Sequence, residues 1–193
     1  MKFALAAKAG VAFVLLLVLT ACVGGVEDTG DDGYIGGSKK IDTIPVGERQ
    51  KAPVLSGVGL DGEKISTADF AGQTIVVNLW GSWCPPCRKE APVLKIAAEE
   101  TADQDVQFLG ILAKDDPASA KAFNTKVGIT YPSIHDADGR NQAAFADTLG
   151  ALGIPTTWII DEKGRLAARI TDSELSAATL VDIIEWTKAD SPA

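Results

Sequence analysis

The sequence of 193 residues is short of positive charge, of histidine and of cysteine. It holds 18 Lys and Arg against 26 Asp and Glu, which gives a formal net charge of −8. Removal of residues 1–21 would take away two lysines and no acid, and would lower this charge to −10. Such a balance argues against binding to nucleic acid and against electrostatic attachment to anionic lipid. We find no internal repeat, and residues 45–193 suffice for one domain with a sizeable core.

Candidate metal ligands of the soft type are equally scarce: three cysteines, at 22, 84 and 87, and the single His135. A structural zinc site takes four ligands, commonly two Cys-x-x-Cys pairs or one pair with two histidines. Once Cys22 is assigned to the N-terminus, as argued next, the set is too small. A cysteine–histidine protease would need His135 beside Cys84, which we do not expect. We predict neither a bound metal nor a cofactor.

The N-terminus begins MKFALAAKAGVAFVLLLVLTAC. Lys2 and Lys8 precede an apolar run, Val11–Leu19, and small residues follow it. This pattern is typical of a secretory signal peptide, which we assign to residues 1–21. The alternative is a transmembrane anchor, which needs about 20 apolar residues. The stretch 9–26 approaches that length only if three glycines and a threonine are counted.

The four residues Leu19-Thr20-Ala21-Cys22 resemble a bacterial lipobox, whose cysteine is lipidated and becomes the first residue of the mature protein. Their place directly after the apolar run strengthens the resemblance. Lipidation also accounts for an odd cysteine in a secreted chain. We therefore predict lipidation of Cys22 and anchoring at the outer face of the cytoplasmic membrane.

A flexible tether is predicted after the lipidated cysteine, over residues 22–48, before a domain at 49–193. Residues 23–44 contain six glycines and five acids without helix or strand periodicity. Such a segment cannot bury enough apolar surface to offset its ordering entropy. A coil of this length has an r.m.s. reach of roughly 25 Å. An extension packed on the domain remains open for residues 39–46.

The remaining sequence alternates strand and helix patterns, which predicts an α/β domain with a central mixed sheet. Apolar, β-branched runs predict buried strands at 74–79 and 106–113. A short strand is expected at 131–135, and hairpins at 54–66, around Asp61-Gly62, and at 156–171, across Glu162-Lys163-Gly164.

Helices are expected between these strands, at 84–100, from Asp116-Pro117, at 140–149 and at 173–188, with a short turn at 67–70. Asp116 is the expected N-cap and Pro117 the first helical residue. In the helix 84–100 we expect four residues to face inward, namely Val93, Leu94, Ile96 and Ala97.

The segment GSWCPPCRKE, residues 81–90, pairs Cys84 with Cys87. Such a pair suits half a zinc site, a static disulfide or a redox couple. A static disulfide would be expected to close a longer loop, because linking four residues constrains the unfolded chain little. Cys84 lies between a buried strand and a helix, where N–H groups and the helix dipole favour a thiolate. Pro85 and Pro86 remove donors there, so we expect a lowered but not extreme pKa for Cys84.

The stretch NLWGSWCPPC, with Gly153-Ile154-Pro155-Thr156-Thr157 some 70 residues later, resembles the thioredoxin fold. The resemblance is closer to the membrane-tethered TlpA/ResA-type thiol–disulfide oxidoreductases and spans residues 53–186. It implies a thioredoxin-like α/β fold, with a central mixed sheet flanked by helices and an N-terminal β-hairpin extension.

The same resemblance implies roles for individual residues. Cys84 would be the exposed attacking thiol and Cys87 the covered resolving thiol, together forming a redox-active disulfide. Pro155 would be a cis-proline facing the disulfide, with the Ile154 backbone pairing with a bound partner strand. The alternative for Pro155 is an ordinary trans proline. Three residues around Cys84 would complete the substrate-binding surface, namely Trp83, Pro85 and Pro86. The other tryptophans, Trp80, Trp158 and Trp186, are expected in the core.

Six residues before the first cysteine, ordinary thioredoxins carry a buried aspartate. This chain departs from that pattern, because the corresponding residue is Asn78. Asn78 cannot ionise. TlpA/ResA-like proteins tend to pair this asparagine with a glutamate in the following helix, and Glu90 stands three residues after Cys87 on the same helical face. We predict that Glu90 is the acid/base partner of Cys87. The alternative is a solvated residue of the helix surface.

The sequence therefore favours an extracytoplasmic, membrane-anchored thiol–disulfide oxidoreductase. The resemblance implies substrates such as apocytochrome c thiols and a membrane electron donor of the DsbD/CcdA type. An oxidant of secreted thiols is the alternative within this class. A peroxiredoxin is disfavoured, because its peroxidatic cysteine usually lies in a threonine-containing loop without a Cys-x-x-Cys partner. A copper(I) chaperone using Cys84, Cys87 and His135 is the alternative from another class.

Overall fold

A computed structural model describes residues 41–151, 153–171 and 174–189. The predicted signal peptide, the lipidation site Cys22 and the tether as far as residue 40 lie outside the described residues. Within the described ranges, no helix is both long and apolar enough to cross a membrane.

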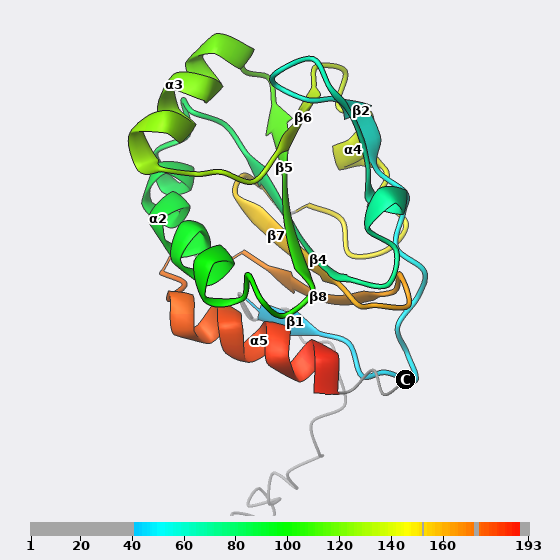
Figure 1. Cartoon of the computed structure of the whole chain (residues 1–193). Helices are drawn as coiled ribbons and strands as arrows, with labels where there is room; N and C mark the ends of the chain where they lie inside the picture. Colours follow the sequence, from blue (N-terminus) through cyan, green and yellow to red (C-terminus); the bar gives the residue numbers. More distant parts are fainter. Residues whose placement is uncertain (1–40, 152, 172–173, 190–193) are drawn as a thin grey trace, which may run out of the picture. The chain divides into compact units, whose positions relative to one another are not determined.

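The described residues form a six-stranded mixed sheet in the order β1-β8-β7-β4-β5-β6 (Figure 1). β4 pairs in parallel with β5, and β5 with β6, whereas the β4–β7, β7–β8 and β8–β1 pairs are antiparallel. The strands are β1 (Ile41–Thr43), β4 (Thr74–Trp80), β5 (Val106–Ala113), β6 (Ser133–Asp136), β7 (Thr156–Ile160) and β8 (Leu166–Ile170). This sheet, flanked by helices, confirms the predicted thioredoxin-like α/β fold.

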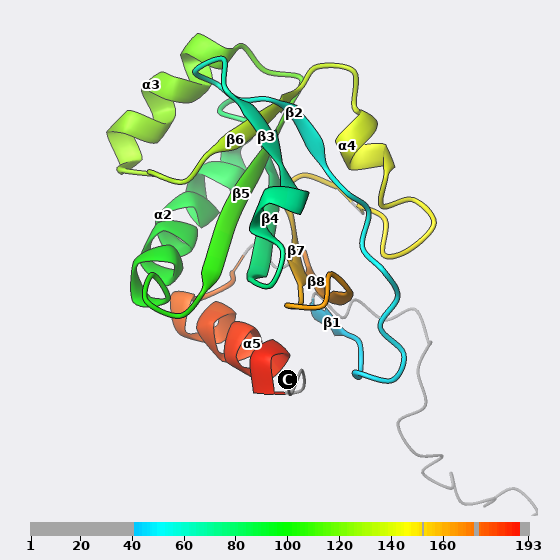
Figure 2. The ribbon, with the colours of Figure 1, turned by 45° about the vertical axis from the view of Figure 1, so that its right-hand side comes forward.

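Side chains of β4 alternate between two apolar layers, as expected for a strand buried on both faces. Ile75, Val77 and Leu79 join one layer, which also contains residues of the N-terminal hairpin and Phe145. Val76 joins the opposite layer, against α2 (Pro85–Glu100) and α5 (Ala177–Ala189). Figures 1 and 2 show α2 and α5 together on one side of the sheet, with the hairpin and α4 (Arg140–Ala143) on the other.

The predicted N-terminal hairpin is confirmed. β2 (Ser56–Val58) pairs antiparallel with β3 (Lys64–Ser66), and Gly62 adopts φ 91° in the connecting turn. A short 3-10 helix, η1 (Thr67–Phe70), follows where a turn of helix was expected, and a capping box from Ser66 begins it. α3 (Pro117–Val127) begins as predicted, because the Asp116 carboxylate accepts a hydrogen bond from the Ser119 N–H at 2.9 Å.

The N-terminal domain boundary lies earlier than the predicted residue 49. β1 pairs with β8, with Ile41 opposite Ile170, and the Asp42 carboxylate binds the Arg169 guanidinium at 2.7 Å. Residues 41–48 therefore belong to the folded domain, as the alternative of a packed extension allowed. The strand β1 was not predicted because it lies in the glycine-rich, acidic segment 23–44, and its partner lies 127 residues further along the chain.

Three helix predictions need correction. Ile96 is 43% exposed instead of inward, because the buried side of α2 is formed by Cys87, Glu90, Ala91, Leu94 and Ala97. The helix predicted at 140–149 ends at Ala143, and turns then carry the Phe145 ring into the core, where it stacks on Trp158 at 4.0 Å. The last helix begins at Ala177 instead of Ser173, with the Ser176 hydroxyl accepting from the Thr179 N–H at 3.1 Å.

Candidate active site

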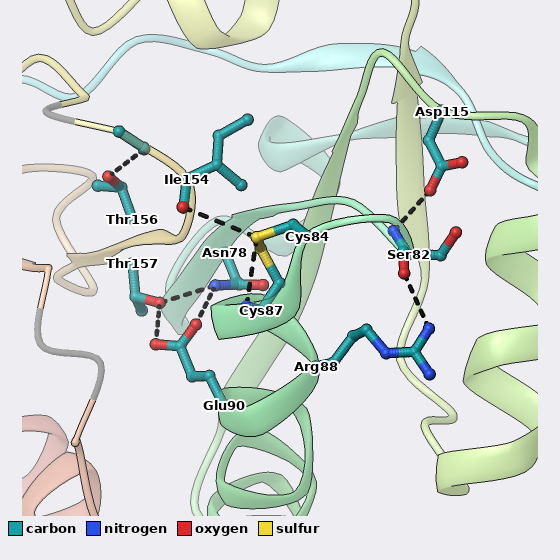
Figure 3. Close-up of a disulfide and its surroundings, with 11 residues drawn as sticks. Asn78, Ser82, Cys84, Cys87, Arg88, Glu90, Asp115, Ile154, Thr156 and Thr157 are labelled. Carbon is teal, nitrogen blue, oxygen red and sulfur yellow. Dashed lines mark hydrogen bonds between the residues drawn. A yellow bond between two sulfur atoms is a disulfide. The ribbon is translucent and has the colours of Figure 1, made fainter.

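The Cys84–Cys87 pair lies at the junction of β4 and α2, and the two sulfurs form a disulfide (Figure 3). Cys84 is the N-cap of α2, and the Cys87 N–H donates to the Cys84 sulfur at 3.3 Å. Pro85 and Pro86 occupy the first positions of the helix, where the absence of an N–H costs no hydrogen bond. The N-terminus of α2 thus places a hydrogen-bond donor and a partial positive charge beside the Cys84 sulfur.

Both sulfurs are covered in this disulfide form. Cys84 is 2% exposed and Cys87 is 3% exposed, and both belong to an apolar cluster with Trp80, Ala91 and Phe123. This burial describes the oxidised couple, whereas the prediction that Cys84 is the more exposed sulfur concerns the reduced protein and stays a prediction. Trp83, next to Cys84, is 55% exposed, as a docking residue requires.

The loop before β7 lies against the disulfide. The Ile154–Pro155 peptide bond is cis, which confirms the predicted isomer. The Ile154 carbonyl oxygen is 3.7 Å from the Cys84 sulfur. Figure 3 shows Ile154 and Cys84 directed toward one another from the two loops. The structure therefore brings together the cysteines and the segment predicted to receive a partner.

Glu90 is buried one helical turn after Cys87, with 4% exposure, so the alternative of a solvated surface residue is wrong. The Asn78 amide donates to one Glu90 carboxylate oxygen at 3.1 Å, and the Thr157 hydroxyl lies 3.5 Å from the other. Asn78 also donates to the Thr157 hydroxyl at 3.0 Å. Asn78 and Thr157 are cross-strand partners in the β4–β7 pair, which explains why the two meet at Glu90.

Thr157, which belongs to this network, and Tyr131 had no predicted role. Thr157 belongs to the quoted Pro-Thr-Thr motif, so its place in the sequence could have drawn attention to it. Tyr131 had no such signal. Burial, and after it the nearby Glu90 charge, raises the pKa of Tyr131 above its ordinary value. The phenol is therefore neutral, and its ring packs against that of Phe108 with 5.6 Å between the ring centroids.

The segment between β4 and Cys84 is held by two further charged side chains. The Ser82 N–H donates to the Asp115 carboxylate at 2.6 Å, and the Arg88 guanidinium donates to the Ser82 carbonyl at 3.1 Å. Neither residue was predicted to belong to the site. Asp115 lies 31 positions after Cys84 in the chain, and only the parallel pairing of β4 with β5 brings it near.

The remaining tryptophans and His135 fall elsewhere. Trp80 and Trp158 are buried, as predicted, whereas Trp186 is only partly buried beneath the Arg49 guanidinium. His135 is in β6, opposite Leu112 of β5. Within the described part of the chain, no three His, Cys, Asp or Glu side chains are grouped so that they could hold a metal ion. The copper-chaperone alternative thus gains no support from the arrangement of Cys84, Cys87 and His135.

Comparisons with known sequences agree with this geometry. The Redoxin family model matches residues 42–183. Thioredoxin-like protein YneN of Bacillus subtilis is 35% identical over 161 residues, which cover 81% of this chain and 86% of YneN. Thiol-disulfide oxidoreductase ResA of Bacillus cereus is 28% identical over 157 residues, which cover 81% of this chain and 84% of ResA.

Solved structures give the same result. A secreted thiol-disulfide isomerase from Corynebacterium glutamicum is 30% identical with a TM-score of 0.70, over 81% of this chain and 96% of that one. A DsbF homologue from Corynebacterium diphtheriae is 31% identical with a TM-score of 0.71, over 81% and 98%. The fold, the disulfide at the N-terminus of α2 and these relatives lead to one conclusion: the chain belongs to the redoxin family and is a thiol–disulfide oxidoreductase of the ResA/TlpA type.

Proposed function

We propose that Cys84 attacks a partner disulfide and that Cys87 resolves the mixed disulfide. The Cys84 thiolate bonds to one partner sulfur, while the partner S–S bond breaks and its second sulfur leaves as a thiolate. Cys87 then loses its proton, bonds to Cys84 and releases the partner as a dithiol. The partner gains two electrons and the Cys84–Cys87 pair loses two. The observation that carries this assignment is the Cys87 N–H at 3.3 Å from the Cys84 sulfur, at the N-terminus of α2.

Glu90 is the proton acceptor for Cys87 in this proposal. Both residues are on the buried side of α2, three positions apart. Asn78 cannot take a proton, but it donates to the Glu90 carboxylate and so holds it in place. A positioned carboxylate can act as a general base directly or through one water.

The substrate-binding surface is formed by Trp83, Pro85, Pro86, Ile154 and Pro155. Its centre is the Ile154 backbone, which faces the Cys84 sulfur. An extended partner segment can pair with that backbone and present its disulfide to Cys84, since main-chain hydrogen bonds recognise a peptide without regard to its sequence.

The assignment of the two cysteines is tested by trapping. With Cys87→Ala, incubation with an oxidised protein substrate should accumulate a mixed disulfide that non-reducing electrophoresis detects. With Cys84→Ala no such adduct should form. Adducts that appear as readily in Cys84→Ala as in Cys87→Ala would contradict the assignment.

We place this activity outside the cytoplasm, with residues 1–21 as a signal peptide and Cys22 lipidated at the outer face of the cytoplasmic membrane. Two acyl chains suffice for stable anchoring. Cys22→Ser should block lipidation and give either uncleaved precursor or released protein, which cell fractionation measures. Processed Cys22→Ser protein that stays in the membrane would contradict the anchor.

For the partners we propose protein disulfides such as that of apocytochrome c, with a membrane donor of the DsbD/CcdA type restoring the dithiol. An oxidant of secreted thiols would use the same residues in the opposite direction. The equilibrium reduction potential of the Cys84–Cys87 couple separates the two. A value near that of thioredoxin, about −270 mV, supports the reductant, and one near that of DsbA, about −120 mV, supports the oxidant.

A further inference from the structure

The backbone of Ser82 is bound by two charged side chains, one at its N–H and the other at its carbonyl oxygen. Residues 81–84 form a turn, closed by a hydrogen bond from the Cys84 N–H to the Gly81 carbonyl at 3.1 Å. The Ser82 N–H donates to Asp115 at 2.6 Å, and the Ser82 carbonyl accepts from Arg88 at 3.1 Å. In Figure 3 Asp115 and Arg88 approach Ser82 from opposite sides.

Each of these side chains is itself held. The second Asp115 oxygen accepts from the Asp116 N–H at 2.8 Å. The preceding residue, Lys114, has φ 49°, a left-handed conformation that residues with a Cβ adopt uncommonly. The Arg88 guanidinium lies over the Phe123 ring of α3 at 5.3 Å. The residues before α3 and the first turn of α2 thus both hydrogen-bond to the backbone of Ser82.

Ser82 directly precedes Trp83 in the chain. The indole of Trp83 folds back over Gly81, so closely that a Cβ at Gly81 would lie 2.7 Å from the indole nitrogen. The place of the indole therefore depends on the path of the turn beneath it. Trp83 is more than half exposed and next to the reacting cysteine.

We infer that Asp115 and Arg88 are positioning residues, which fix the backbone of Ser82 and thereby hold the Trp83 indole where a macromolecular partner docks. Asp115 is only partly buried and Arg88 is exposed, so water can replace their hydrogen bonds without unfolding the domain. The role of Trp83 in docking is part of the proposed function, and this inference depends on it.

The inference predicts a difference between large and small disulfide substrates. Insulin reduction needs docking, whereas 5,5′-dithiobis(2-nitrobenzoic acid) reacts with the Cys84 thiolate without it. Asp115→Ala should lower kcat/KM for insulin about tenfold, because misplaced docking groups reduce productive encounters. The single-turnover rate of the reduced enzyme with the small disulfide should change less than about twofold. Asp115→Asn keeps an acceptor oxygen and should lose less with insulin.

Asp116→Asn is the matched control. Asp116 is the neighbouring acid and caps α3 through Ser119, and asparagine caps helices about as well as aspartate. This variant should match the wild type with both substrates. If Asp115 acts through Trp83, Asp115→Ala should cause no further loss of insulin reduction in the Trp83→Ala background.

Three results would overturn the inference. Equal losses of Asp115→Ala with insulin and with the small disulfide would indicate general damage to the turn. A Trp83→Ala defect with insulin but none in Asp115→Ala would show that the carboxylate does not position the indole. Insulin reduction unchanged in Trp83→Ala, with the small disulfide still reduced, would remove the docking role of Trp83 and the inference with it, while leaving the Cys84 chemistry intact.

Discussion

Two buried carboxylates lie at opposite ends of β7, and they are held in different ways. Glu90 receives its hydrogen bonds from the Asn78 amide and the Thr157 hydroxyl, at the start of the strand. Asp161, directly after the strand, contacts the Arg49 guanidinium at 3.2 Å and the Arg165 guanidinium at 2.7 Å. The partners of Glu90 thus include a neutral amide and a neutral hydroxyl, whereas those of Asp161 include two charged guanidinium groups.

The consequence for protonation differs at the two ends. Burial raises the pKa of Asp161, but the hydrogen bonds of Arg165 and Arg49 outweigh it and hold the pKa below its ordinary value. Asp161 therefore stays charged over the physiological range and serves stability. At Glu90 the Thr157 hydroxyl can either donate to a carboxylate or accept from a carboxylic acid. The partners of Glu90 can thus accommodate either protonation state, as its proposed role as proton acceptor for Cys87 would require.

We expect the largest effect, a loss of stability, from removing the contact between Asp161 and Arg49. Asp161→Ala leaves the buried Arg49 guanidinium without this partner, and removal of one member of a buried ion pair typically costs about 3–5 kcal/mol. The free energy of unfolding, measured in urea, should fall accordingly. Glu99→Ala, which removes an exposed partner of Lys95, should change it little. A similarly small loss in Asp161→Ala would mean that the Arg49 contact adds nothing to stability.

The second test removes the charge at the other end. Glu90→Gln keeps the shape, so stability should change little, but resolution of the mixed disulfide by Cys87 should slow about a hundredfold if Glu90 is its base. The measurement is the decay rate of a preformed mixed disulfide, with iodoacetamide labelling of Cys84 followed against pH. Glu99→Gln, on the exposed side of the same helix, is the control. Superimposable pH curves together with unchanged decay would leave Cys87 without an identified proton acceptor.

The smallest effect concerns acid stability. A lowered pKa means that the Asp161 contribution is fully present above its ordinary value of 3.8 and is lost as the pH falls through the lower folded value. Asp161→Asn should therefore show a flatter loss of stability than the wild type as the pH falls below 3.8. The urea midpoint at several pH values measures this slope. Parallel slopes in the two proteins would exclude Asp161 as a source of the acid sensitivity.

Local patterns were enough to predict much of the fold and the centre of the site. The apolar run of β4, the glycine turn at Gly62 and the cap at Asp116 depend on neighbours in the chain, and each is found where expected. The redox couple could be predicted from the four residues Cys84-Pro85-Pro86-Cys87. These features follow from residue order because their physical causes are local.

The parts of the fold and of the site that could not be predicted from the sequence depend on pairing between segments far apart in the chain. β1 forms only because β8 offers it an edge, and Thr157 reaches Glu90 only through the register of β4 with β7. Asp115 reaches the segment before Cys84 only through the parallel pairing of β4 with β5. Ile96 was assigned inward, but it stands two positions after Leu94, about 200° around the helix. The buried side of α2 instead carries Cys87, Glu90, Ala91, Leu94 and Ala97.

The short strand β1 has a practical consequence for recombinant work. A fragment that begins at the predicted boundary, residue 49, would lack Ile41–Thr43 and the Asp42–Arg169 contact. The outer edge of β8 would then expose unpaired N–H and C=O groups, which are a template for strand addition between molecules. Such a fragment should aggregate more readily than one that keeps residues 41–48, so purified domains should begin upstream of Ile41.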